Sequence, residues 1–158
     1  MAEEKELKQA KEVYKTLCTR LDEHNWRYET DEENLKIHCG AQGDDLPMEI
    51  YIEVDKKRQL VSLLSPMPFT VPENRRSGIA VAVSVANYGM VDGSFDFDYL
   101  TGRLIFRMTT SYRESIIGKA LFTYMLMCSC VTIDRFNDKF LMICKNEMTV
   151  NEILDFVK

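Results

Sequence analysis

Residues 95–108 have the pattern of a β-hairpin, and this pattern constrains the fold more than any other part of the chain. Apolar and polar residues alternate on both sides of a turn at residues 99–102, as they do in a sheet with one buried face. The face expected to be buried carries Phe95, Phe97, Leu104, Phe106 and Met108. The other face carries Asp96, Asp98, Arg103, Ile105 and Arg107, and such opposite charges on neighbouring strands fix the register. The hairpin is therefore structural, and nothing in it suggests catalysis.

Periodicity predicts the remaining elements. Residues 4–23 and 72–88 are expected to be helices, although small and β-branched residues alternate in the second one, which also fits a strand. Pro72 suits the start of that helix and Gly89 its end. A long helix over 113–145, kinked near Asp134, and a final helix opened by the capping-box spacing of Thr149 and Glu152 are expected to follow. Strands are predicted at 26–29, 34–39, 47–55 and 58–65.

The order of these elements is helix, strands, helix, β-hairpin, helices. It predicts an α+β fold in which helices flank an antiparallel β-sheet. No repeat, low-complexity tract or linker divides the sequence, so residues 1–158 are expected to form a single domain.

Charge and cysteine content exclude several classes of function. A net charge of −5 at pH 7 argues against nucleic-acid binding, which requires a basic face. The five cysteines are odd in number and have no zinc-binding spacing, and the N-terminus is charged and does not resemble a signal peptide. The apolar run at 120–133 is too short to span a bilayer. We therefore expect a cytoplasmic protein with free thiols and no membrane or nucleic-acid partner.

No local pattern indicates catalysis, a metal or a cofactor. The two histidines, His24 and His38, have no nearby ligand pattern, and Cys128 and Cys130 would point to different faces of a helix. Asp96 and Asp98 are better explained by ion pairs with the neighbouring arginines, and no glycine-rich phosphate loop is present. The sequence thus predicts that the protein is not an enzyme and has no cofactor or metal site.

Two segments are candidates for contact with another polypeptide. The helix at 120–133 is apolar nearly all round, so it must be covered on more than one side, by the sheet and by either a second helix or another chain. The small residues of 78–88 would allow close approach of the protein's own sheet or of a second subunit. The candidate dimer or partner surface consists of Gly78, Ala82, Val85, Ala86, Tyr124, Met125 and Met127. Packing within the chain remains open for both segments.

Three stretches resemble the YbjN family. These are the helix from Ile79 to Asn87, the strand motif GSFDFD at 93–98 and the motif TGRLIFR at 101–107. The similarity extends weakly over residues 26–156, and Phe97 departs from the family's usual aliphatic residue. The resemblance implies a fold like that of type III secretion chaperones, usually dimeric, in a family described as candidate sensory-transduction regulators. It implies no catalysis and supplies no binding residues.

Our main hypothesis is a non-catalytic protein-interaction module, chaperone-like or regulatory, that acts as a cytosolic homodimer and binds a segment of another protein. It could bind by strand addition or by holding a helix in a groove. The alternative is a small-molecule sensor or enzyme with a pocket between sheet and helices. Candidate residues for such a pocket are His38, Tyr51, Arg107 and Tyr112. A secretion chaperone proper would additionally need a secreted client.

Overall fold

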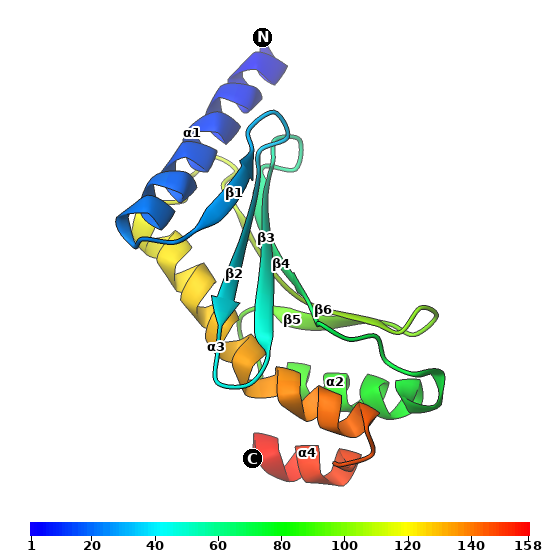
Figure 1. Ribbon diagram of the computed structural model, residues 1–158. Helices are drawn as coiled ribbons and strands as arrows, with labels where there is room; N and C mark the ends of the chain where they lie inside the picture. The colour runs from blue at the N-terminus through cyan, green and yellow to red at the C-terminus, as the bar shows by residue number, and fades with distance from the viewer.

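The structure is a computed structural model that describes residues 1–158. A six-stranded antiparallel sheet has the strand order β1-β2-β3-β4-β6-β5. Figure 1 shows α1 and α3 on one side of the twisted sheet, with α2 and α4 beside the end that carries β5 and β6. The elements are α1 (Ala2–Glu23), β1 (Tyr28–Asp31), β2 (Lys36–Gln42), β3 (Pro47–Asp55), β4 (Leu60–Pro66), α2 (Arg76–Tyr88), β5 (Ser94–Asp98), β6 (Arg103–Ser111), α3 (Lys119–Cys144) and α4 (Val150–Val157).

The sheet has one buried face and one open face. Along β3, buried and exposed residues alternate from Met48 to Val54, which is the period expected when helices cover one side only. In the hairpin, Phe95 and Phe106 are opposite each other and buried, whereas Phe97 is only partly buried. This confirms the predicted α+β class and the predicted faces of the hairpin.

The hairpin register matches the expected charge pairing. Asp98 and Arg103 are register partners, and Arg107 Nε lies 3.0 Å from Asp96 Oδ2. Gly102 has φ +77° at the turn, and a Cβ there would lie 2.4 Å from the Val71 carbonyl oxygen. Only glycine fits this close approach, which brings the segment after β4 against the hairpin.

Helix α2 resolves the ambiguity between helix and strand. It begins at Arg76, after a short 3₁₀ turn at Glu73–Arg75 that follows Pro72. Ala82 and Ala86 are buried on its inner side, and α4 packs against α2. The capping box predicted for α4 is present, because Thr149 and Glu152 each accept a hydrogen bond from the other's backbone N–H.

The long helix starts later than predicted. Residues 113–118 are not helical, and α3 begins only at Lys119. Glu114 has φ +50°, a left-handed conformation that a helix cannot contain. The Gln9 side chain donates to the Tyr112 and Ser115 carbonyls, so α1 fixes this segment as a loop.

The end of α3 is well defined, and Figure 1 shows the helix curving along its length from α1 towards α2. Asn146 has φ +59°, its N–H donates to the Ile143 carbonyl, and the Glu147 N–H donates to the Met142 carbonyl. These bonds form a Schellman motif, which satisfies carbonyls at the end of the helix. The helix therefore stops at Cys144, one residue before the predicted end at residue 145.

Candidate functional site

The outward side of α3 is apolar, and the rest of the chain leaves much of it exposed. Ala120, Tyr124, Met127 and Val131 recur at helical spacing opposite the buried side of the helix. The exposed fractions are 52% for Tyr124, 48% for Met127 and 65% for Val131. No charged residue lies between Lys119 and Asp134. We call these four residues the α3 stripe. Large exposed apolar patches occur at interaction sites, which makes the stripe a candidate for one.

Tyr124 is fixed at one border of the α3 stripe. Its hydroxyl donates a hydrogen bond to the Asp92 carboxylate in the loop between α2 and β5. That hydrogen bond raises the pKa of Tyr124 to about 12, so the hydroxyl remains a protonated donor at neutral pH. The stripe is thereby connected to the loop that carries Val91, another exposed apolar residue.

The structure separates the seven residues of the candidate dimer or partner surface. Tyr124 and Met127 lie outside, in the α3 stripe. Ala82, Ala86 and Met125 are buried inside this chain, so their side chains are not on its surface. Val85 is partly buried against the core, and a Cβ on Gly78 would contact Val150 of α4 at 3.7 Å. The small residues of α2 therefore accommodate the chain's own helices.

The two edges of the sheet differ. At the β5 edge, the Asn87 side chain accepts from the Phe95 N–H at 2.8 Å and donates to the Phe95 carbonyl at 2.9 Å, as a neighbouring strand would. At the other edge, β1 pairs only with β2. A groove of about 720 Å³ runs beside β1, and Cys18 and Asp22 of α1 and Tyr28 and Thr30 of β1 are among its lining residues. The edge open to a further strand is therefore that of β1.

The open face of the sheet brings together three of the four residues proposed for a small-molecule pocket. His38, Tyr51 and Arg107 lie in one cross-strand row. This row is on the face of the sheet that points away from the core and the helices. The full row, from β1 across to β5, is Glu29, His38, Tyr51, Leu64, Arg107 and Ser94. The alternative hypothesis placed these residues between sheet and helices, whereas the register places them on the uncovered face.

Tyr112, the fourth of those residues, is fully buried in the core. Its hydroxyl donates to the Asp55 carbonyl at 3.0 Å, and burial raises the pKa of Tyr112. It is thus a structural residue that ties the end of β6 to β3, and it has no access to a ligand on the open face.

The thiols have the properties of structural cysteines. All five are free, and burial raises the pKa of Cys39 to about 12 and that of Cys130 to about 11. Both are therefore protonated at neutral pH and are poor nucleophiles. No group of three His, Cys, Asp or Glu side chains lies close enough together to hold a metal ion. None of the helices has the length and apolarity needed to cross a membrane.

Comparison with solved structures shows which fold this is. The chain is similar to YbjN from E. coli, described as a candidate transcription regulator, with a TM-score of 0.57 and 13% identity over 83% of this chain and 88% of that chain. It is also similar to a chain of the HopA1–SchA chaperone–effector complex, with a TM-score of 0.52 and 9% identity over 78% of this chain and 91% of that chain. No family model and no curated protein matches the sequence.

At these identities the similarity shows the fold alone. The chain has a YbjN-like, chaperone-like fold, as the hairpin motifs predicted. Sequence analysis had found the apolar helix, but the open β1 edge and the shared row of His38 and Tyr51 emerged only from the strand order and register.

Proposed function

We propose that this protein is a non-catalytic interaction module, chaperone-like or regulatory, that binds a segment of another protein. The observation that carries the proposal is the α3 stripe, an uncharged helix surface that the chain's last helix leaves uncovered. The similarity in fold to a chain of a chaperone–effector complex supports it.

The proposed homodimer forms by antiparallel packing of two α3 stripes about a two-fold axis. Such an interface uses the same patch on both subunits, so Tyr124 of one chain meets the Met127–Val131 region of the other. Lys119 and Asp134 flank the stripe at its two ends. Within the chain, Lys119 already pairs with Glu23, and Asp134 accepts a hydrogen bond from the Asp44 N–H, so the proposed antiparallel orientation depends on the two-fold symmetry of the apolar stripe.

The client segment is proposed to bind at the β1 edge. An extended peptide there gains main-chain hydrogen bonds from a strand that pairs on one side only, and the groove beside α1 accommodates its side chains. The β5 edge is the less suitable one, because Asn87 already occupies the main-chain groups of Phe95. The proposal places the protein in the cytosol, where a reducing environment preserves its free thiols.

Sedimentation velocity at tens of micromolar tests the dimer. We expect the wild-type chain to sediment as a dimer and Val131→Glu as a folded monomer of 18.4 kDa, because each new carboxylate would be buried against the apolar stripe of the other chain. Val81→Glu is the matched control, since Val81 is also exposed, at 51%, but lies on α2. A wild-type protein that remains monomeric, or a Val131→Glu variant that still dimerises, contradicts the α3 interface.

A further inference from the structure

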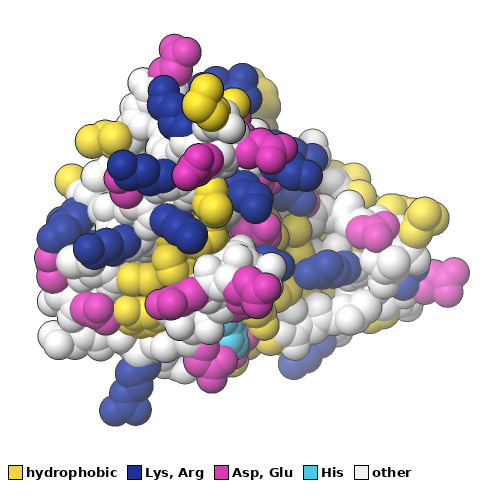
Figure 2. All heavy atoms as spheres, turned by 90° about the horizontal axis from the view of Figure 1, so that it is seen from above, with side chains coloured by type: hydrophobic (Ala, Val, Ile, Leu, Met, Phe, Trp, Pro, Cys, Tyr) yellow, Lys and Arg dark blue, Asp and Glu magenta, His cyan; other side chains and the backbone are white.

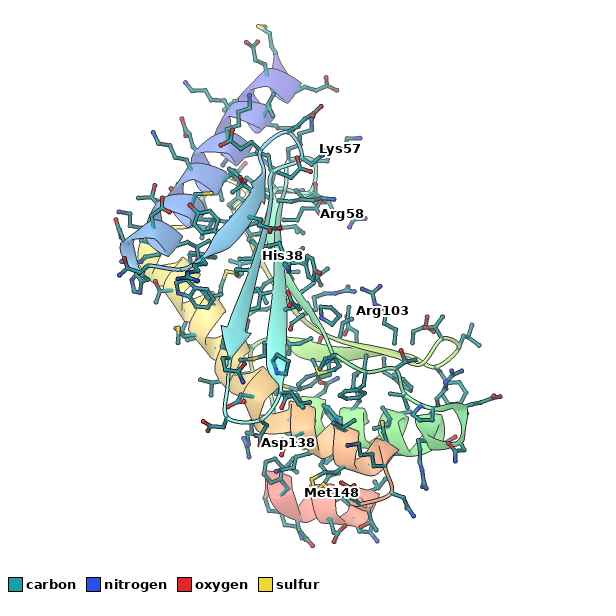
Figure 3. The ribbon with its side chains drawn as sticks, in the orientation of Figure 1. His38, Lys57, Arg58, Arg103, Asp138 and Met148 are labelled. Atoms are coloured by element: carbon teal, nitrogen blue, oxygen red, sulfur yellow. The ribbon has the colours of Figure 1, made fainter.

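A cavity lies on the open face of the sheet, on the opposite side from α1 and α3. It has a volume of about 380 Å³ and is formed by residues of β1, β2, β3 and β4. Figure 3 labels His38 and Arg103 on this open side of the sheet. Tyr51 is 45% exposed here, although it is a large aromatic residue in the middle of a strand that is paired on both sides. The rest of this chain therefore leaves part of the Tyr51 ring accessible to a ligand.

An aromatic stack forms the wall of this cavity. The imidazole of His38 lies on the ring of Tyr51 with 4.5 Å between centroids and 9° between planes. His38 Nε2 is 2.5 Å from Glu49 Oε2, and Nδ1 is 3.7 Å from Glu29 Oε2. These two contacts, one at each ring nitrogen, fix the orientation of the imidazole. The Tyr51 ring that stacks on it is therefore also held in place. A fixed, exposed aromatic face is the arrangement that attracts a cationic group.

The charged groups that line the cavity are mostly acidic. Glu29, Asp31 and Glu53 contribute three carboxylates, whereas Lys36 is the one ammonium group. Lys36 faces Asp31 on one side and Glu53 on the other in the register, so its charge is already compensated. Figure 2, the view from above, shows Asp and Glu side chains beside a small visible patch of histidine, and Lys and Arg side chains spread over the same face of the molecule. The site is therefore complementary to positive charge.

The position of the acidic residues relates this cavity to the β1 edge. Glu29 and Asp31 alternate along β1 and belong to the rows that cross the open face through His38 and Lys36. A strand added to β1 would place every second side chain on this same face, beside those carboxylates. Charged residues on a short edge strand also discourage uncontrolled pairing. We therefore expect β1 to pair with a strand of opposite charge.

We infer that the open-face cavity binds the guanidinium or ammonium group of an arginine or lysine in the client segment. The cation lies over the exposed part of the Tyr51 ring, beside Glu53. Because β3 lies two strands in from the β1 edge, the cation comes from a part of the client that crosses the open face, while another part of the client pairs with β1. The inference rests on the proposed function and adds its chemistry, since it selects basic segments over neutral or acidic ones.

Chemical-shift mapping with three synthetic peptides tests this selectivity. The probes are Ac-Thr-Arg-Thr-Arg-Thr-Arg-Thr-NH₂ and the matched peptides with glutamine or glutamate in place of arginine. We expect the arginine peptide to shift the amide signals of β1, β2 and β3 around His38 and Tyr51. The glutamine peptide should bind several-fold more weakly, and the glutamate peptide should not bind.

Two variants locate the cation. Tyr51→Leu preserves the bulk of the side chain but removes the aromatic face, and we expect it to weaken binding of the arginine peptide about threefold to fivefold. Glu53→Gln preserves the shape and removes a charge, and we expect a loss of about twofold to threefold. Tyr88→Leu and Glu3→Gln are the controls, because both residues are exposed and lie outside the cavity.

The outcomes separate this inference from the proposed function. Equal binding of the arginine and glutamine peptides at the β1 edge, unaffected by Tyr51→Leu, would overturn the cation site and leave strand addition intact. Shifts spread over the acidic surface, or no binding of any peptide, would overturn the cation site too. The α3 dimer is measured independently by sedimentation.

Discussion

Helices α2 and α3 are both rich in uncharged residues, yet they use them in opposite ways. In α2 the small residues Ala82 and Ala86 face inward, where α4 packs against the helix. In α3 the inward side is just as well buried, but the outward side, with Met127 and Val131, is also apolar and remains exposed. Small residues on a helix can thus accommodate the chain's own elements, whereas a second apolar side that stays exposed is the better candidate for contact with another polypeptide.

The largest expected effect tests the inward side of α2. Ala82→Asp places a carboxylate at a fully buried position with no partner, and we expect it to lower the free energy of unfolding by about 4 kcal/mol. Val81→Asp, at the neighbouring exposed position, should change it by less than about 0.5 kcal/mol. Urea titration monitored by circular dichroism measures both. Similar losses in the two variants would refute the assignment of the inner and outer sides of α2.

The next prediction concerns the C-terminal end of α2, where Asn87 holds the β5 edge. Asn87→Ala leaves the N–H and the carbonyl of Phe95 without their partners, and we expect a loss of about 2 kcal/mol in unfolding free energy. Asn74→Ala removes an exposed asparagine that lies before α2, and should be near neutral. If Asn87→Ala is equally neutral, water replaces the amide at this edge and β5 is as accessible to strands as β1.

Most of the fold could be predicted from the sequence because its signals are local. The alternation at Pro47–Asp55 gave that strand its correct bounds, and the capping box gave the start of α4. The start of α3 could not be predicted, since Gln9, more than a hundred residues away in the chain, holds residues 113–118 as a loop. No local breaker precedes Gly118, so the sequence pattern extends the helix too far.

The candidate site was predictable only in part. The apolar character of α3 is plain in the sequence, and Tyr124 and Met127 were placed on the candidate surface. Which part of α3 is left uncovered depends on where α4 docks. Helix α4 docks on α2 and beside the second half of α3, where Phe156 packs on Phe136. The proximity of His38 to Tyr51 depends on the register of β2 against β3, and the polar loop between these strands has no turn pattern that defines it.

Loss of the N-terminal cap of α4, the helix that packs on α2, should have a smaller effect on stability. Thr149→Ala removes the hydroxyl that accepts the Glu152 N–H in the capping box, and the typical cost of losing such a cap is about 1 kcal/mol. Thermal or urea unfolding should register this loss, because α4 buries Ile153 against the core. Thr16→Ala, inside α1, removes a threonine hydroxyl that caps no helix and serves as the control. Equal responses would mean that α4 contributes little to covering α2.

The smallest expected effect is a gain. A Cβ at Gly78 would lie 3.7 Å from Val150 Cγ2 and 4.0 Å from Ile143 Cγ2, both ordinary contact distances. Gly78→Ala should therefore raise the free energy of unfolding by about 0.5–1 kcal/mol, because alanine loses less backbone entropy in a helix. Gly93→Ala is the contrasting control and should destabilise, since Gly93 has φ +75° and its Cβ would meet the Phe106 ring at 2.5 Å.

The same Gly78→Ala variant distinguishes the two helices as interfaces. If α2 met a second subunit through a close backbone approach at Gly78, the added methyl group would weaken the dimer in sedimentation experiments. If the dimer forms through the α3 stripe, association should be unchanged while stability rises. A weaker dimer with unchanged stability would therefore show that the subunits meet through α2 and not through α3. In that case α2, not α3, would be the helix with a side for another polypeptide.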